Sequence, residues 1–255
     1  DKGQADNDYL NQFVANRDEL DKYLASIDLD AACAATGVER ALLEEAANHL
    51  GQAASVAIVI GRDVMGSTQA EGAVAAIANL AMVSGALHGE QGGLFPIASK
   101  GNSQGLIDAG VAPEFLPGLI DYATGKEQFS ASWQTTLPEG GADATGILAG
   151  IEQGTIQALF LAGTNPLVNF PESTRWRKAL EKIDLLVVQD ILSSELTKLA
   201  TVVLPGAATA EKRGSVTALD NRVNKLRIAV APPGEARPDL AILSELFARL
   251  TDKPE

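Results

Sequence analysis

The sequence has few of the residues that build metal centres and redox sites. Among its 255 residues it has one cysteine, Cys33, and two histidines, His49 and His88. One cysteine excludes an intrachain disulfide and a zinc site or iron–sulfur cluster held by several cysteines of this chain. His49 stands at the end of a predicted helix and His88 at the start of a loop, and neither has the spacing of metal ligands. We therefore predict no metal site within this chain.

Positive charge and long apolar runs are also scarce. The chain carries 20 lysines and arginines against 33 acidic residues, a net charge of −13. Binding to phosphate backbones or anionic membranes needs clustered positive charge, so we expect neither nucleic acid nor a membrane surface as a partner. The most apolar candidate helix, 73–87, is interrupted by Asn79, Ser84 and Gly85. It is too short to span a bilayer, and we expect no direct membrane insertion.

Familiar catalytic motifs are missing. The sequence has no Gly-x-Ser-x-Gly elbow, Walker loop or His-Glu-x-x-His pattern. The segment from Gly61 to Gly66 follows a predicted strand but lacks the three glycines of a dinucleotide fingerprint. We assign no catalytic residue to the chain. It starts at Asp1 without an initiator methionine, which we interpret as a piece of a longer protein.

Three short apolar runs between residues 154 and 205 organise the rest of the chain. They cover residues 159–161, 185–188 and 202–204, and a polar stretch of helical period separates the first two. Such continuous runs are typical of parallel strands buried on both faces. Strands that alternate with helices predict right-handed crossovers. The expected fold is α/β, a Rossmann-like doubly wound, mainly parallel sheet with helices on both faces.

The flanking regions complete the predicted organisation. Residues 1–36 read as an N-terminal helical segment that packs on a main α/β domain, residues 37–255. Within that domain, glycines and prolines gather between residues 85 and 154, which predicts a long irregular loop insertion. Residues 208–231 lack a helical period and suggest a short β excursion, and a last helix follows Pro238.

The ends of the first two apolar runs carry the candidate binding residues. In an open α/β sheet these ends hold the ligand-binding loops. Pro166 keeps Asn165 extended, Gly163 allows close backbone approach, and the carboxylate of Asp190 could accept two N–H bonds from a guanine-like edge. Asn165 and Asp190 could equally satisfy backbone groups of their own turns. The residues alone leave these alternatives open.

Several linked segments resemble the molybdopterin oxidoreductase family. They are Ala-Leu-Phe-Leu-Ala-Gly-Thr-Asn-Pro at 158–166, Leu-Val-Val-Gln-Asp at 186–190, Ala-Thr-Val-Val-Leu-Pro at 200–205, Glu-Lys-Arg-Gly-Ser-Val-Thr at 211–217 and Gly-Asn-Ser-Gln-Gly at 101–105. The resemblance implies a domain whose loop ends hold the guanosine arm of a pterin cofactor. Carried over, the residues lining that arm would be Gly163, Asn165, Pro166, Gln189 and Asp190, as a working or a vestigial site.

Within the family, residues 101–118 look most similar to the large iron–sulfur G subunit of NADH-quinone oxidoreductase, respiratory complex I. Thr201 and Ala218 depart from the family's usual Asp and Asn, and the loop 61–68 lacks the histidine common in active members. The departures favour a domain that keeps the fold as a scaffold. This resemblance implies a cofactor-free structural domain that supports electron transfer from NADH to quinone. It also implies iron–sulfur clusters elsewhere in the parent, partners in the peripheral arm of complex I, and a cytoplasmic location at the inner face of the membrane.

Two alternatives remain. The first is the pterin-guanosine-binding part of a molybdenum or tungsten oxidoreductase, such as an NAD-linked formate dehydrogenase α subunit, with molybdopterin guanine dinucleotide as its cofactor. The second is an independent nucleotide-binding regulatory domain. Whether the chain belongs to an enzyme with a working pterin site stays open at this point.

Overall fold

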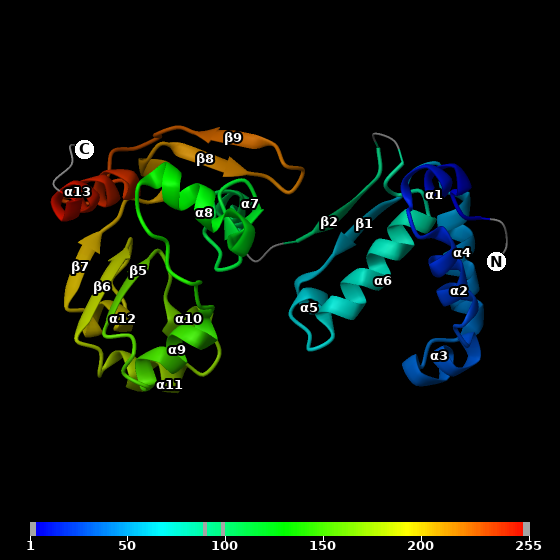
Figure 1. The fold of residues 1–255 in the computed structure, drawn as a ribbon, viewed down its shortest axis with the longest axis horizontal. Helices are drawn as coiled ribbons and strands as arrows, with labels where there is room; N and C mark the ends of the chain where they lie inside the picture. Colours follow the sequence, from blue (N-terminus) through cyan, green and yellow to red (C-terminus); the bar gives the residue numbers. More distant parts are fainter. Residues whose placement is uncertain (1–3, 89–90, 98–99, 252–255) are drawn as a thin grey trace. The chain divides into compact units, whose positions relative to one another are not determined.

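The protein divides into two compact units, Asp1–Lys100 and Gly101–Glu255 (Figure 1). The computed structural model describes residues 4–88, 91–97 and 100–251. The boundary between the units lies at Lys100. The N-terminal helices belong to the same unit as the first strand. The two units are described separately below.

Unit 1 begins with four helices and continues with a βαβ element. The elements are α1 (Asn7–Phe13), α2 (Arg17–Ala25), α3 (Leu29–Thr36), α4 (Arg40–Gln52), β1 (Ala57–Ile60), α5 (Arg62–Met65), α6 (Ala70–Val83) and β2 (Gly93–Pro96). Strands β1 and β2 pair in parallel. Helix α3 begins after the N-cap Asp28, and its C-cap, Gly37, adopts a left-handed conformation with φ 70°.

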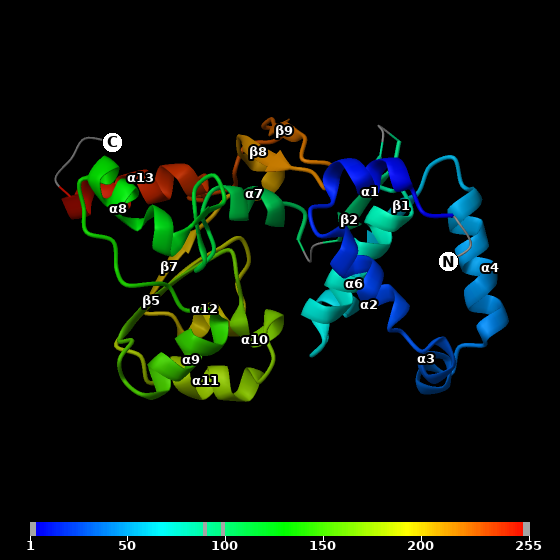
Figure 2. The same ribbon diagram turned by 45° about the vertical axis from the view of Figure 1, so that its right-hand side comes forward.

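A polar tether joins α1 to the end of α6. The backbone N–H of Asp6 donates to the carbonyl of Val83 at 2.9 Å, and the Asp6 carboxylate contacts Nδ1 of His88 at 2.6 Å. Asp6 also caps α1 by accepting from the N–H of Tyr9. Figure 2 shows α1 beside α6. This contact joins the first N-terminal helix to the helix between β1 and β2.

Unit 2 is built around the three strands that the sequence predicts. Its elements are α7 (Ser103–Asp108), β3 (Phe115–Leu116), β4 (Ile120–Asp121), α8 (Tyr122–Trp133), α9 (Ala144–Glu152), β5 (Ala158–Ala162), α10 (Pro166–Asn169), α11 (Ser173–Leu180), β6 (Leu185–Asp190), α12 (Glu195–Leu199), β7 (Val202–Pro205), the 3₁₀ turn η1 (Thr209–Glu211), β8 (Gly214–Thr217), β9 (Val223–Leu226) and α13 (Asp239–Thr251). Strands β5, β6 and β7 form a parallel sheet in that order, and β8 and β9 form the predicted β excursion as an antiparallel hairpin.

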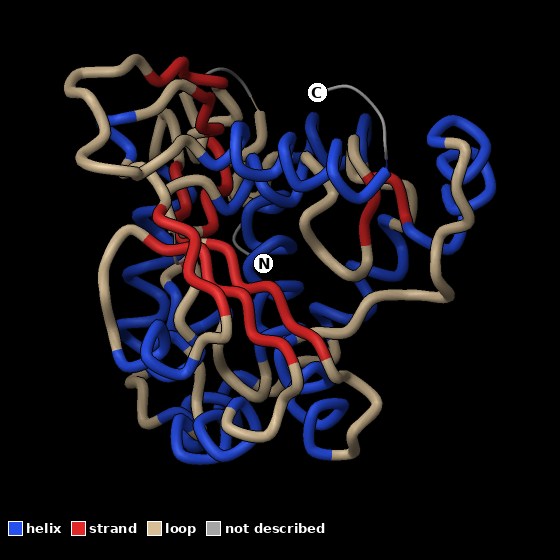
Figure 3. Tube along the Cα trace, turned by 90° about the vertical axis from the view of Figure 1, so that its left-hand side faces the viewer, coloured by secondary structure: helices blue, strands red, loops and turns tan. Residues whose placement is uncertain are grey.

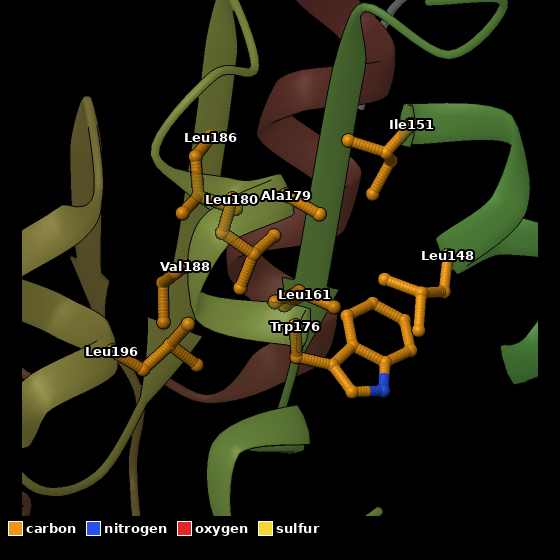
Figure 4. Packing of buried hydrophobic residues seen from close by; sticks show 9 residues of the cluster. All are labelled: Leu148, Ile151, Leu161, Trp176, Ala179, Leu180, Leu186, Val188 and Leu196. Atoms are coloured by element: carbon orange, nitrogen blue, oxygen red, sulfur yellow. The ribbon is translucent and has the colours of Figure 1, made fainter. Parts of the chain in front are cut away.

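One face of this sheet carries the core of unit 2. Trp176 and Leu180 of α11, with Leu148 of α9, pack against Leu186 and Val188 of β6 (Figure 4). The whole cluster comprises Leu148, Ile151, Leu161, Trp176, Ala179, Leu180, Leu186, Val188 and Leu196. The expected α/β class, with a parallel sheet flanked by helices, is confirmed.

The opposite face of the same sheet differs from the expectation of helices on both faces. Phe160, Leu185 and Val202 lie on it and are each about two-fifths exposed. The strand order explains the difference. Because β5, β6 and β7 advance in one direction across the sheet, right-handed crossovers place α11 and α12 on the same face.

The stretch 85–154, predicted to be irregular, holds more structure than expected. It contains β2, α7, the β3–β4 hairpin, α8 and all of α9. Helix α8 is difficult to predict from its sequence, Tyr-Ala-Thr-Gly-Lys-Glu-Gln-Phe-Ser-Ala-Ser-Trp. Its Gly, Ser and Thr residues have low helix propensity, and its apolar residues form no clear stripe along one face of the helix. Among the described residues, none of the helices is both long and apolar enough to cross a bilayer.

Candidate functional site

The carboxyl ends of β5, β6 and β7 meet at one edge of the sheet in unit 2. The backbone N–H of Gly163 donates to the carbonyl of Gln189 at 2.8 Å, and that of Gly206 donates to the carbonyl of Asp190 at 3.0 Å. Gly163 has φ 62°, and a Cβ added there would meet nothing within 4 Å. Three of the predicted site residues, Gly163, Gln189 and Asp190, are therefore brought together, with open space beside the glycine.

The other two predicted residues start a short helix. Pro166 is the first residue of α10, and Oδ1 of Asn165 accepts from the N–H of Leu167 at 3.0 Å as an N-cap. Asp190 makes a similar local bond, because its Oδ1 accepts from the N–H of Ile191 at 2.7 Å. The local turn role considered for Asn165 and Asp190 is thus observed, for the single side-chain oxygen of Asn165 and for one carboxylate oxygen of Asp190.

A buried amide is the unusual polar feature of this edge. Gln189 is 3% exposed, and its Nε2 donates to Oδ1 of Asp239 at 2.6 Å. Oδ2 of Asp239 in turn pairs with Nζ of Lys212. A carboxylate only accepts hydrogen bonds, so it fixes the nitrogen side of the amide toward Asp239. Lys212 stabilises the charge of that carboxylate.

The fixed orientation leaves the other side of the amide unsatisfied. Oε1 of Gln189 is buried and has no hydrogen-bond partner among the residues that the structure describes. A buried acceptor without a donor costs about 1–3 kcal/mol, so it calls for an explanation such as a bound water or ligand group. This is an orphaned acceptor at the edge where α/β folds bind ligands.

Sequence reasoning named Gln189 but missed the residues that orient it. Lys212 and Asp239 follow Gln189 at distances in sequence of 23 and 50 residues, respectively, and belong to no common motif. Their meeting depends on the path of the chain through the β8–β9 hairpin. Only the resemblance of 211–217 to a family segment pointed toward this region.

A cavity of about 620 Å³ adjoins the ends of β6 and β7. It is lined by Asp190, Ile191, Leu192, Pro205, Gly206, Ala208, Glu211, Pro233, Glu235 and Ala236. Its size is in the range of small-molecule sites. Three carboxylates and no lysine or arginine line it, so its walls suit hydrogen-bond donors better than phosphate groups. Of the predicted site residues only Asp190 lines this cavity.

A second pair of predicted segments also meets within unit 2. Oδ1 of Asn102 accepts from the backbone N–H of Thr217 at 2.9 Å, across 115 residues of sequence. A Cβ on Gly105 would lie 2.3 Å from this oxygen, so the close approach needs glycine. The segment 101–105 is thereby joined to the arm 211–217 that contains Lys212.

The remaining chemical candidates have structural roles. His49 lies 3.6 Å from Glu45 on the same helix, and His88 forms the tether to Asp6. Among the described residues, no group of three or more histidine, cysteine, aspartate or glutamate side chains is arranged to hold a metal ion.

Comparison with known families agrees with this arrangement. A family model described as molybdopterin oxidoreductase matches residues 14–249. The chain belongs to the molybdopterin oxidoreductase family, which confirms the family resemblance.

Named relatives point to particular subunits within the family. The chain is 43% identical over 254 residues to the NADPH-Fe(3+) oxidoreductase subunit alpha of Geobacter sulfurreducens. The match covers 98% of this chain and 29% of the relative. It is 36% identical over 245 residues to the F420-dependent formate dehydrogenase subunit alpha of Methanocaldococcus jannaschii, covering 94% of this chain and 36% of the relative. Formate dehydrogenase H of Escherichia coli is 30% identical over 253 residues, and the match covers 96% of this chain and 35% of the relative.

The chain therefore spans about a third of the length of these relatives. Among solved structures, acetylene hydratase from Pelobacter acetylenicus matches the fold with a TM-score of 0.74 at 18% identity. The match covers 97% of this chain and 37% of that structure. These named relatives favour the formate dehydrogenase alternative over the complex I G subunit.

Proposed function

We propose that this chain forms part of the cofactor-binding α subunit of a molybdenum or tungsten oxidoreductase, in which it holds the guanosine arm of a pterin cofactor. The proposed parent is an α subunit of the formate dehydrogenase or NADPH-Fe(3+) oxidoreductase type. Its partners would be the other subunits of such an enzyme. The relatives' names support this choice, because two of them are α subunits, one of an NADPH-Fe(3+) oxidoreductase and one of a formate dehydrogenase, and the third is a formate dehydrogenase.

The observation that carries the proposal is the orphaned Oε1 of Gln189. A guanine base offers N–H donors on one edge, and a buried acceptor at the carboxyl end of a parallel sheet fits such a donor. Asp190, the next residue, adds a carboxylate to the wall of the adjoining cavity, and Gly163 leaves its backbone open to close approach. The residues present thus fit the guanosine end of the cofactor.

The roles of the chain's residues follow from this geometry. Asp239 and Lys212 hold the Gln189 amide so that it presents an acceptor. Asn165 and Pro166 fix the turn after β5 by capping α10. The cofactor, when bound, supplies the redox chemistry through its metal. The residues described here bind and orient its arm.

The substitution Gln189→Met in the complete polypeptide tests this assignment. Methionine keeps the approximate shape of glutamine and removes both the orphaned acceptor and the Nε2 donor to Asp239. The gain from the first and the loss from the second oppose each other, so we expect an unfolding midpoint near that of the wild type. The bound pterin and metal should fall sharply, as measured by pterin fluorescence after release and by elemental analysis. The exposed Gln153→Met is the matched control and should retain both.

Two results would contradict the proposal. A wild-type protein with iron and sulfide but no pterin would favour the cofactor-free scaffold role, as in the complex I interpretation. Full pterin content in Gln189→Met would remove Gln189 from the binding site.

A further inference from the structure

The β8–β9 hairpin of unit 2 gathers positive charge in a chain that is otherwise acidic. Residues 212–227 carry five basic side chains and one acidic side chain, whereas the net charge of the whole chain is −13. The hairpin forms a two-stranded sheet of its own, separate from the parallel sheet whose strands cross the foreground of Figure 3. This segment is therefore a local exception to the charge of the molecule.

Only two of these five cations have an anionic partner within the described residues. Lys212 pairs with Asp239, and Nε of Arg222 lies 2.7 Å from Oδ2 of Asp220. The side chains of the remaining three are exposed and form no ion pair or hydrogen bond with any residue that the structure describes: Arg213, Lys225 and Arg227.

The strand register places these three side chains together. Lys225 lies opposite Ser215 in the ladder, and residues two apart along a strand share a face. The two chain segments stay side by side beyond the ladder, because the N–H of Ala229 donates to the carbonyl of Ala210 at 2.8 Å. One face of the hairpin, which we call the basic face, thus carries all three unpaired cations: Arg213, Lys225 and Arg227.

The cations of the basic face repel one another. Like charges on neighbouring strands destabilise a sheet, and no carboxylate of the described residues offsets them here. A carboxylate brought to this face from outside the chain would offset the repulsion. Arginine suits such a contact, because its planar fork can donate two parallel hydrogen bonds to one carboxylate.

The extent of the charge indicates the kind of anion that fits. Small ligands bind in concave sites, and none of the three cations lines the cavity at the ends of β6 and β7. Nucleic acids and anionic bilayers extend far beyond one hairpin, so the acidic remainder of the chain would repel them. A short acidic segment of a protein meets mainly the local charge, because salt screens charges that are more than about 8 Å away at physiological ionic strength.

We propose that the basic face binds an acidic segment of a partner subunit, whose aspartate or glutamate carboxylates pair with Arg213, Lys225 and Arg227. Charge complementarity supports this occupant. So do the names of two relatives, each of which is a subunit alpha. The inference rests on the part of the proposed function that makes the parent an α subunit assembled with other subunits.

Zero-length crosslinking of the purified complex tests the occupant directly. A carbodiimide joins a lysine Nζ to a carboxylate that touches it, so mass spectrometry should find Lys225 joined to an aspartate or glutamate of another subunit. Lys178, an exposed lysine of α11 without an ion pair among the described residues, is the control and should be joined far less. A free Lys225 would mean a solvated face, and a crosslink to its own chain or to a second copy would mean another occupant. Each of these results would overturn the proposal.

Removal of the charges measures their contribution to assembly. Lys225→Gln/Arg227→Gln in the complete α subunit should weaken binding of the partner subunits on the order of tenfold at physiological salt, and less at high salt. Neither side chain has a partner within the described residues, so the unfolding midpoint of the α subunit should stay unchanged. The matched control Lys178→Gln/Lys182→Gln removes the same charge from exposed positions and should leave the affinity unchanged. Equal affinities of the two double variants would overturn the proposal.

Neither readout depends on pterin. A crosslink from Lys225 to another subunit in a complex without pterin would refute the pterin-binding role alone. Pterin in a complex in which Lys225 stays free would refute the binding role of the basic face alone.

Discussion

The two units of this chain build their interiors in different ways. Unit 2 buries nine residues in one cluster, including Trp176 and five leucines. The corresponding cluster of unit 1 has three buried residues, Val56, Ala81 and Ala86. Large side chains bury more apolar area than alanines, so the core of unit 2 contributes far more hydrophobic stabilisation.

The polar contacts of unit 1 take on greater weight for this reason. Helices α2, α3 and α4 contribute no fully buried residue, while Phe13 and Leu42 are more than half exposed. The tether formed by Asp6, Val83 and His88 holds α1 against α6. The comparison teaches that unit 2 is stabilised mainly by its core, whereas unit 1 depends more on this tether.

Core truncation gives the largest expected effect and tests that difference directly. Leu186→Ala in β6 should cost unit 2 about 2–5 kcal/mol, in the upper part of that range, because large neighbours hold the cavity open. The cost of Ile60→Ala in β1 should lie at the lower end of that range. Both tryptophans, Trp133 and Trp176, are in unit 2, so their fluorescence during urea unfolding reports that unit, and hydrogen exchange reports unit 1. Equal costs would refute the contrast between the cores.

The ease of predicting the fold also differs along the chain. The strands β5, β6 and β7 lie within one or two residues of the predicted runs, because each is a continuous apolar stretch ending in small, polar or proline residues. Helix α8 was missed, because tertiary contacts form it despite a poor helical pattern. Local sequence patterns predict the elements that are strongly buried. They fail for elements whose structure depends on contacts with residues distant in the sequence.

The candidate site shows the same limit. Gly163, Gln189 and Asp190 could be named from the sequence because strand ends and a family resemblance mark them. Lys212 and Asp239 could not, since their side chains meet Gln189 only after the chain has passed through a hairpin. The open face of the sheet was also unexpected, because an apolar run looks alike whether one or both of its faces are covered.

Substitutions of two glycines in unit 2 distinguish the effect of backbone strain from the effect of blocking a ligand's close approach. Gly163 and Gly154 both have positive φ, 62° and 73°, and a Cβ at either position meets nothing within 4 Å. Alanine at either should destabilise unit 2 by about 1 kcal/mol, because the left-handed conformation is strained. Only Gly163→Ala should also reduce the pterin content of the complete polypeptide. Equal pterin content in the two variants would show that the edge beside Gly163 does not approach the cofactor.

Removing one helix cap in each unit sharpens the comparison further. Asp143 caps α9, which supplies Leu148 and Ile151 to the core, so Asp143→Ala should lower the stability of unit 2 by about 1 kcal/mol. Asp28 caps α3, which buries no residue, so Asp28→Ala should fray that helix and leave the rest of unit 1 within about 0.5 kcal/mol. Circular dichroism during unfolding and hydrogen exchange of each helix give the two values. A larger loss for Asp28→Ala would mean that α3 is integral to unit 1.

The smallest expected effect is the pH dependence of the tether in unit 1. The N–H of Tyr9 and the His88 side chain both bond the Asp6 carboxylate, and they hold its pKa below the ordinary value. Because the folded pKa is the lower one, the tether contributes stability above the unfolded value of about 3.9, and this contribution is lost as the pH falls through the folded pKa. Asp6→Asn should therefore weaken the protection of α1 from hydrogen exchange near neutral pH, and the difference from wild type should shrink as the medium becomes more acidic than about pH 4. Asp8→Asn, on the same helix, is the control. A difference that persists unchanged in acid would show that the tether acts through shape and not through the carboxylate charge.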